Sequence, residues 1–130
     1  MRKPLLATLI LIASLLLAMT AVPTPAEAAE GRFRHVVCFK FKDGTPAAEI
    51  AEIEKAFAAL KGQIDTIVDF EWGTSDNIEP LNDGFTHCFL VTFADKKGLE
   101  VYLPHPAHEA FVAKIKPLLD KVFVFDYTAQ

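Results

Sequence analysis

The sequence lacks an excess of basic residues, an internal repeat and a cysteine close behind its hydrophobic N-terminal run. Its 130 residues carry 13 Lys and Arg against 17 Asp and Glu, a net charge of −4, so nucleic acid and anionic membranes are poor partners. No similarity recurs at the spacing of solenoid repeats, which argues against an array of stacked units. No cysteine stands where a lipoprotein would be acylated.

The N-terminal 28 residues have the three parts of an export signal. Two basic residues follow Met1, an uncharged apolar run extends from Leu5 to Ala18, and Ala26-Glu27-Ala28 is a small-x-small cleavage pattern. The uncharged run continues to Val22, just long enough for an uncleaved anchor, but the two prolines before Ala26 favour cleavage. We therefore expect residues 1–28 to be a signal peptide, and residues 29–130 to be one domain, secreted or periplasmic, without stable membrane association.

Two hydrophobic periodicities alternate along the remaining chain. Strict alternation of side chains predicts four strands, at residues 35–42, 67–72, 86–93 and 122–125. Apolar spacings of three and four predict helices at 46–61 and 106–116, with a helical turn at 99–103. Thr45 is a good N-cap for the first helix and Gly62 a good C-terminal stop. The order βαββαβ with right-handed crossovers predicts an α+β, ferredoxin-like protomer, with helices on one face of an antiparallel sheet.

The other face of the predicted sheet is apolar as well. Val36 and Cys38 alternate onto it from the first strand, and Cys88 and Leu90 from the third. In a monomer this face would be an exposed apolar patch, so we expect a homodimer packed sheet against sheet as a dimeric α/β barrel. Cys38 and Cys88 either form a disulfide in an oxidising compartment or pack as two small buried thiols.

Titratable rings are concentrated on the apolar faces of these elements. Pro106 suits the first position of a helix, which makes His105 its cap. His108 then shares one helical face with a stripe of apolar residues: Phe111, Val112, Ile115 and Leu119. His35 and His87 each begin a strand and point to its apolar side. Such histidines are either part of a functional site or core residues with a satisfied hydrogen bond.

Four spaced motifs resemble the stress-responsive dimeric α/β-barrel (Dabb) family. They are His35-Val36-Val37-Cys38-Phe39-Lys40-Phe41-Lys42-Asp43, Gly84-Phe85-Thr86-His87, Tyr102 followed by His105-Pro106-Ala107-His108, and Phe125-Asp126-Tyr127. The resemblance covers about residues 33–128 and implies a ferredoxin-like protomer whose sheet faces that of a second copy. A plant polyketide cyclase of this family closes a linear poly-β-ketone by intramolecular aldol condensation, without a metal or organic cofactor.

The resemblance to that cyclase implies a set of site residues. His108 is the general base, Tyr102 is the phenol that polarises a carbonyl oxygen, and His35 and His87 line the same pocket. Asp126 matches an aspartate of the motif and is implied to orient an imidazole. An imidazole and a phenol suit proton removal beside a carbonyl, because one accepts a proton near neutral pH and the other donates to the oxygen that gains charge. The candidate substrate-binding residues are Val37, Phe39, Phe57, Phe89 and Phe111.

Three functions are compatible with these residues. The first is an exported A/B-barrel protein that binds a small apolar carbonyl ligand and performs cofactor-free lyase or cyclase chemistry on it. The second is a non-catalytic envelope stress protein with structural histidines. The third is haem or metal binding, which His105-x-x-His108 does not favour because no carboxylate or thiolate joins it on the same face. We therefore expect no metal and no cofactor.

Overall fold

The computed structural model describes residues 21–130. Most of the expected signal peptide, residues 1–20, lies outside the described residues. A short helix, α1 (Pro25–Ala29), precedes the first strand. No helix within residues 21–130 combines the length and apolar character needed to cross a bilayer.

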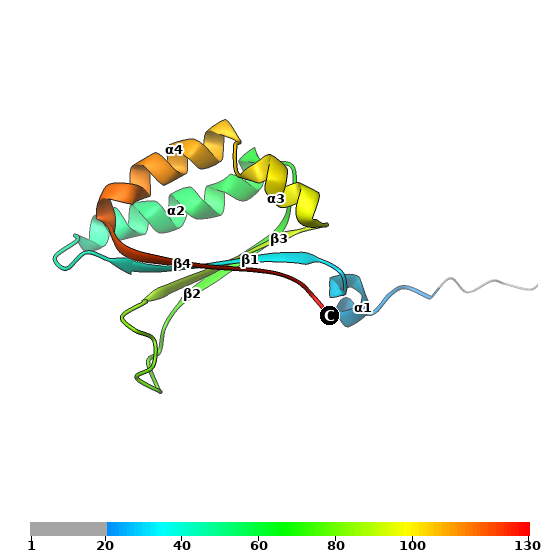
Figure 1. Ribbon diagram of the computed structural model, residues 1–130, viewed down its shortest axis with the longest axis horizontal. Helices are drawn as coiled ribbons and strands as arrows, with labels where there is room; N and C mark the ends of the chain where they lie inside the picture. Colours follow the sequence, from blue (N-terminus) through cyan, green and yellow to red (C-terminus); the bar gives the residue numbers. More distant parts are fainter. Residues whose placement is uncertain (1–20) are drawn as a thin grey trace, which may run out of the picture.

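The domain has two layers, a four-stranded sheet and a layer of helices (Figure 1). The elements after α1 are β1 (Phe33–Phe41), α2 (Ala47–Gln63), β2 (Ile67–Thr74), β3 (His87–Phe93), α3 (Lys96–Tyr102), α4 (Pro106–Ile115), a 3₁₀ turn (Lys116–Leu118) and β4 (Leu119–Thr128). The strand order is β2-β3-β1-β4, and every neighbouring pair is antiparallel. Helices α2, α3 and α4 cover one face, and the other is open. The ferredoxin-like α+β prediction is confirmed.

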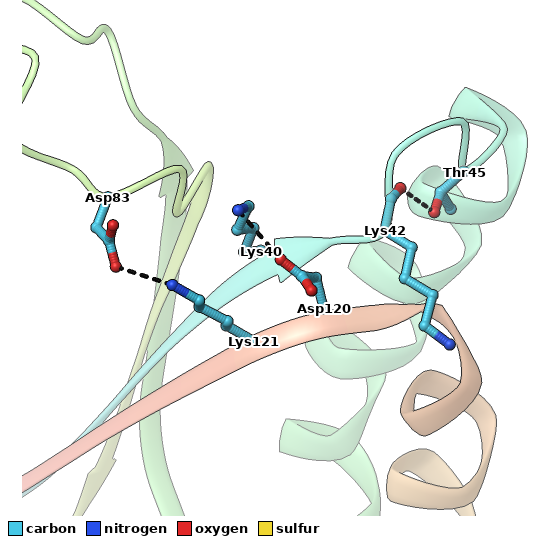
Figure 2. Close-up of polar contacts among 6 residues, drawn as sticks. All are labelled: Lys40, Lys42, Thr45, Asp83, Asp120 and Lys121. Atoms are coloured by element: carbon cyan, nitrogen blue, oxygen red, sulfur yellow. Dashed lines mark hydrogen bonds and ion pairs between the residues drawn. The ribbon is translucent and has the colours of Figure 1, made fainter.

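The ends of several helices and strands differ from the predicted ends, in part because of local hydrogen bonds. Pro46 rather than Thr45 occupies the N-cap of α2, because the Thr45 hydroxyl donates back to the Lys42 carbonyl at 2.7 Å (Figure 2). Helix α2 also passes through Gly62 to Gln63. Strand β4 extends beyond the predicted 122–125, since it pairs with β1 along nearly all of that strand.

The core lies between the sheet and the helices and is rich in phenylalanine. Phe57 of α2 is central: its ring centroid lies 4.5 Å from that of Phe89 on β3 and 4.6 Å from that of Phe111 on α4. Phe57 and Phe89 are almost fully buried. Removing such a ring typically costs about 3–5 kcal/mol, so Phe57 contributes strongly to the packing of α2 and α4 on the sheet.

The open face of the sheet carries a row of aromatic side chains from β4. Phe123, Phe125 and Tyr127 are 48%, 56% and 39% exposed, and they share this face with the thiols predicted to lie there. The segment between β2 and β3 is attached to one end of the face, where Asp83 accepts from Lys121 Nζ at 3.3 Å (Figure 2). Beside it Lys40 pairs with Asp120 at 3.1 Å.

Candidate functional site

A cavity of about 450 Å³ lies on the helix side of the sheet, between α4 and the strands β1 and β4. Three of the predicted catalytic residues line it, His35, Tyr102 and His108, each from a different element. Four predicted substrate-binding residues line it as well: Val37, Phe39, Phe57 and Phe111. The side chains around these polar groups are mostly apolar, which suits an apolar ligand with one polar group.

Tyr102 is buried at the C-terminal end of α3, between two imidazoles. Its ring centroid lies 4.2 Å from that of His108 and 5.7 Å from that of His35. Its hydroxyl is buried and has no hydrogen-bond partner among residues 21–130. Burial raises the pKa of the Tyr102 phenol well above its ordinary value, so the hydroxyl remains protonated and available as a donor.

His108 is half-buried in the first turn of α4, and its tautomer is set by the backbone. Its Nδ1 lies 2.9 Å from the Leu103 carbonyl oxygen. A carbonyl can only accept, so Nδ1 carries the proton and Nε2 keeps a lone pair. Burial lowers the pKa of His108 below its ordinary value, although the hydrogen bond to Leu103 acts in the opposite direction. The ring is therefore a neutral base near pH 7.

His35 is buried on β1 and is held by a carboxylate from β4. Its Nδ1 lies 2.6 Å from Asp126 Oδ1, and the two residues are direct partners in the β1–β4 register. An ionised carboxylate only accepts, which places a proton on Nδ1. The expectation that Asp126 orients an imidazole agrees with this contact, and the imidazole is that of His35.

The short connection between α3 and α4 brings Tyr102 and His108 together. The His105 amide donates to the Tyr102 carbonyl at 3.1 Å, which closes the chain after α3. The ring of His105 accepts from the Ala107 amide at 3.1 Å, and Pro106 follows in the first turn of α4. His105 is thus the helix cap that the sequence predicts, and it does not line the cavity.

His87 does not line this cavity, contrary to the expectation that it shares a pocket with His35. His35 lies near the start of β1 and His87 begins β3, but the two strands are antiparallel. The two rings therefore lie toward opposite ends of the sheet: His35 is opposite Val91, and His87 is opposite Phe39. The Nε2 of His87 lies 3.0 Å from Glu54 Oε1 on α2. Glu54 is therefore a half-buried partner that ties α2 to the sheet.

Phe89 is the other predicted residue that does not line the cavity. It is fully buried beneath Phe57 and also stacks with Trp72 at a centroid distance of 5.5 Å. Further lining residues, which the sequence did not predict as part of the site, come from α4, from the segments on either side of it, and from β4. These are Leu103, Val112, Ile115, Lys116, Leu119, Asp120, Lys121, Val122 and Val124. The apolar stripe of α4 predicted a buried helix face. Only the pairing of β4 with β1 shows that a cavity separates this face from β4.

Several apolar residues that line the cavity are partly exposed. Leu103 and Val112 are 47% and 40% exposed on the helix side, and Val122 and Val124 are 54% and 48% exposed on β4. Because β4 is an edge strand, a ligand can enter between it and α4. Within the described part of the chain, no group of three or more His, Cys, Asp or Glu side chains is arranged to hold a metal ion.

Comparison with known proteins places this geometry in a family. Residues 33–129 match the Stress responsive A/B Barrel Domain, Dabb. The match covers the whole sheet and the three helices above it. The chain belongs to the Dabb family.

Two curated relatives span nearly the same length. The stress-response A/B barrel domain-containing protein HS1 of Arabidopsis thaliana is 41% identical over 101 residues, which cover 78% of this chain and 93% of HS1. Olivetolic acid cyclase of Cannabis sativa is 32% identical over 97 residues, covering 75% of this chain and 96% of the cyclase.

Solved structures share the fold. Hydroxynitrile lyase from Passiflora edulis superimposes with a TM-score of 0.72 at 24% identity, covering 78% of this chain and 95% of the lyase. A ferredoxin-like protein from Bacteroides fragilis, described as dimeric, has a TM-score of 0.62 at 23% identity and covers 76% of this chain and 97% of its own.

Proposed function

We propose that this protein binds a small, mainly apolar carbonyl compound in the cavity between α4 and β4, and acts on it as a cofactor-free lyase or cyclase. The observation that carries the proposal is the Tyr102 hydroxyl, a buried donor without a partner among the described residues, at the wall of an apolar cavity. Leaving a buried hydroxyl unpaired costs about 1–3 kcal/mol. A carbonyl oxygen of the ligand would accept from it and remove that cost.

The two imidazoles complete the chemistry. With the ligand oxygen on Tyr102, the Nε2 lone pair of His108 takes a proton from the carbon beside the carbonyl, and Tyr102 donates to the enolate oxygen that forms. His35, held by Asp126, packs against the other side of the phenol. The enolate carbon then attacks a second carbonyl in ring closure, and the alkoxide that forms takes up the proton held by His108. The reverse sequence of steps is a carbon–carbon lyase reaction.

The similarity to olivetolic acid cyclase, at 32% identity, supports the cyclase half of this proposal. The apolar lining supports a ligand with an alkyl or aryl portion beside its carbonyl group. The cavity volume of about 450 Å³ corresponds to a small molecule rather than a polymer.

The test is hydrogen–deuterium exchange beside the carbonyl of methyl hexyl ketone, followed by NMR in buffered D₂O. The wild type should accelerate exchange over buffer. His108→Gln should lower the rate by about 10²-fold or more, and Tyr102→Phe by about 10²-fold. Glu100→Gln is the matched control, because Glu100 is exposed on α3 and does not line the cavity, and it should leave the rate unchanged.

Equal exchange rates in buffer and in all four proteins would overturn the catalytic proposal. Ketone binding that persists in that case, measured by chemical-shift changes near Tyr102, would leave a carrier protein without a reaction. Absence of both binding and exchange would favour the structural interpretation of the histidines.

We infer also that the protein is a homodimer joined through the open face of the sheet. The row Phe123, Phe125 and Tyr127 is a contiguous exposed aromatic patch of the kind that marks an interface. Fold neighbours such as the Bacteroides fragilis protein are described as dimeric. A second copy of the same face would cover the patch without blocking the cavity, which lies on the helix side.

We infer, finally, that the chain is exported and cleaved after Ala28. The proposed cut precedes β1, which begins at Phe33, so every strand and the three helices over the sheet remain in the product. Intact-mass measurement of the protein from the envelope or medium of its host tests this. A chain that still begins at Met1 would contradict cleavage.

A further inference from the structure

Cys38 and Cys88 lie directly opposite each other on neighbouring strands. They are partners in the antiparallel β1–β3 register, and both side chains project onto the open face of the sheet. The two thiols are free in the structure, with Cys38 half-buried and Cys88 exposed. Fifty positions separate them in the sequence, so their proximity is a product of the fold.

The hydrogen-bond pattern determines which type of cross-strand pair they form. The Ala129 amide, at the end of β4, donates to the Arg32 carbonyl at 2.8 Å, so the backbone of Arg32 points toward β4. Arg32 and Cys38 are both even-numbered, so their backbone groups point to the same neighbouring strand. Backbone groups of successive strand residues are directed to opposite neighbours. Phe39, an odd-numbered residue, accordingly accepts from Thr86 on the β3 side at 3.0 Å. The backbone of Cys38 therefore bonds to β4, and Cys38 and Cys88 form a non-hydrogen-bonded pair.

Residues in such pairs approach more closely than those in hydrogen-bonded pairs. Their Cα atoms are typically about 4.5 Å apart, and disulfides form over Cα separations of about 4.4–6.8 Å. Burial, followed by the hydrogen bond to Cys88, raises the pKa of Cys38 to about 11. Because Cys88 is exposed and Cys38 is half-buried, Cys88 is the thiol that reacts first with a reagent. Cys38 is then the thiol that reacts in the second step.

In a single protomer the open face leaves room for a reagent, and because the proposed dimer would cover this face, oxidation takes place before the two copies assemble. A hollow of about 630 Å³ on the open face is lined by both cysteines and by residues of the segment between β2 and β3. His35 and Val37 project to the opposite side of β1. Chemistry at the thiols is therefore separated from the carbonyl cavity by the thickness of the sheet.

We propose that Cys38 and Cys88 are a reversible disulfide site, oxidised by a low-molecular-weight disulfide. The Cys88 thiolate attacks one sulfur of that disulfide, which forms a mixed disulfide and releases one thiol. Cys38 then attacks the Cys88 sulfur, which forms the cross-strand bond and releases the second thiol. Two cysteine thiols are oxidised, the reagent is reduced to two thiols, and the two cysteine protons end on those thiols.

The consequence is a covalent link between the two central strands. β1 and β3 are adjacent in the middle of the sheet, and a link over so long a loop restricts the unfolded chain strongly. The bond should raise the melting temperature by about 5–15 °C. It should leave the chemistry at Tyr102 and His108 unchanged, because neither cysteine lines that cavity.

The experiment uses the purified protein with oxidised and reduced glutathione as the probe. In one arm the folded protein is incubated with oxidised glutathione, and in the other the protein is refolded from denaturant in the redox pair, so that access to the thiols is not limiting. The expected product in the refolding arm is one chain lighter by two hydrogens, with a Cys38–Cys88 cross-linked peptide and a raised melting temperature that dithiothreitol reverses. Cys38→Ser should instead accumulate the glutathione adduct of Cys88.

Three results would overturn the proposal. The first is wild-type protein that keeps both thiols free in both arms. The second is wild-type protein that accumulates the glutathione adduct as Cys38→Ser does, which would show that Cys38 does not attack. The third is a cross-link that leaves the melting temperature unchanged or lowers it, which would show that the native sheet does not accommodate the bond.

Discussion

The imidazole of His35 and the carboxylate of Asp126 meet at 2.6 Å across the pairing of β1 with β4. This contact holds a buried histidine at the wall of the cavity and ties the edge strand to the sheet. Asp126→Asn keeps the shape but removes the charge. We expect ketone exchange to fall by about tenfold or more, through loss of ring orientation, and the free energy of unfolding to fall by about 1 kcal/mol. Asp69→Asn, which removes an exposed carboxylate paired with Lys61, is the control for activity.

Tyr102→Phe should separate stability from activity. The hydroxyl is buried and unpaired among the described residues, so replacing it with hydrogen removes a desolvated polar group and should raise the free energy of unfolding by about 1 kcal/mol. The same variant should lose exchange activity. Urea denaturation followed by tryptophan fluorescence measures the first effect. A clear loss of stability would mean that the hydroxyl has a partner in the folded protein.

His108 should make stability depend on pH in a defined direction. Its pKa in the folded protein is lowered, chiefly by burial, so between that lowered pKa and about pH 6.5 the unfolded chain binds more protons than the folded one. The free energy of unfolding should therefore fall as the pH drops through the ordinary histidine range. His108→Gln should show a shallower fall between about pH 7.5 and pH 5. Identical slopes in the two proteins would contradict the burial of His108.

Exchange activity should follow the same titration. A general base works only when unprotonated, so the rate should rise with pH along an acid limb and level off. Because the pKa of His108 is lowered, the midpoint should lie below about 6.5. A midpoint clearly above that value would assign the base to another group.

His87→Ala should have the opposite profile to His108→Gln. The His87 ring packs between the sheet and α2 and pairs with Glu54 at 3.0 Å, so its removal should lower the free energy of unfolding by about 2–4 kcal/mol. Exchange activity per folded molecule should stay at the wild-type level, since His87 is outside the cavity. Circular dichroism melts together with the exchange assay check both parts.

Phe125→Asp should break the proposed dimer. Phe125 is 56% exposed in the middle of the aromatic row on β4, and a carboxylate there would be desolvated between two facing sheets. Analytical ultracentrifugation should show a dimer for the wild type and a monomer for the variant. Val101→Asp is the matched control, because Val101 is similarly exposed, at 52%, on α3 away from that face. Two monomeric variants, or none, would exclude this face as the specific contact.

The sequence predicts the positions of the individual helices and strands, but not how the strands pair along their length. Alternation predicts β1 well, because its burial alternates at every residue, and the Pro106 signal places α4 correctly. Strand β4 was predicted too short, since its apolar run gives no hint of how far β1 supports it. The resemblance implies one pocket for His35 and His87, but histidines near the starts of two neighbouring strands come together only if the strands run parallel, and β1 and β3 are antiparallel.

Strand β4 carries two surfaces on alternate residues. Val122, Val124 and Asp126 belong to the cavity side, while Phe123, Phe125 and Tyr127 form the aromatic row of the open face. Since side chains alternate with a period of two, a one-residue insertion or deletion at the start of β4 would exchange the two sets. Substitutions can change the ligand site and the subunit contact separately. Length changes in this strand would abolish both at once, so we expect homologous sequences to tolerate many residue types here but no gaps.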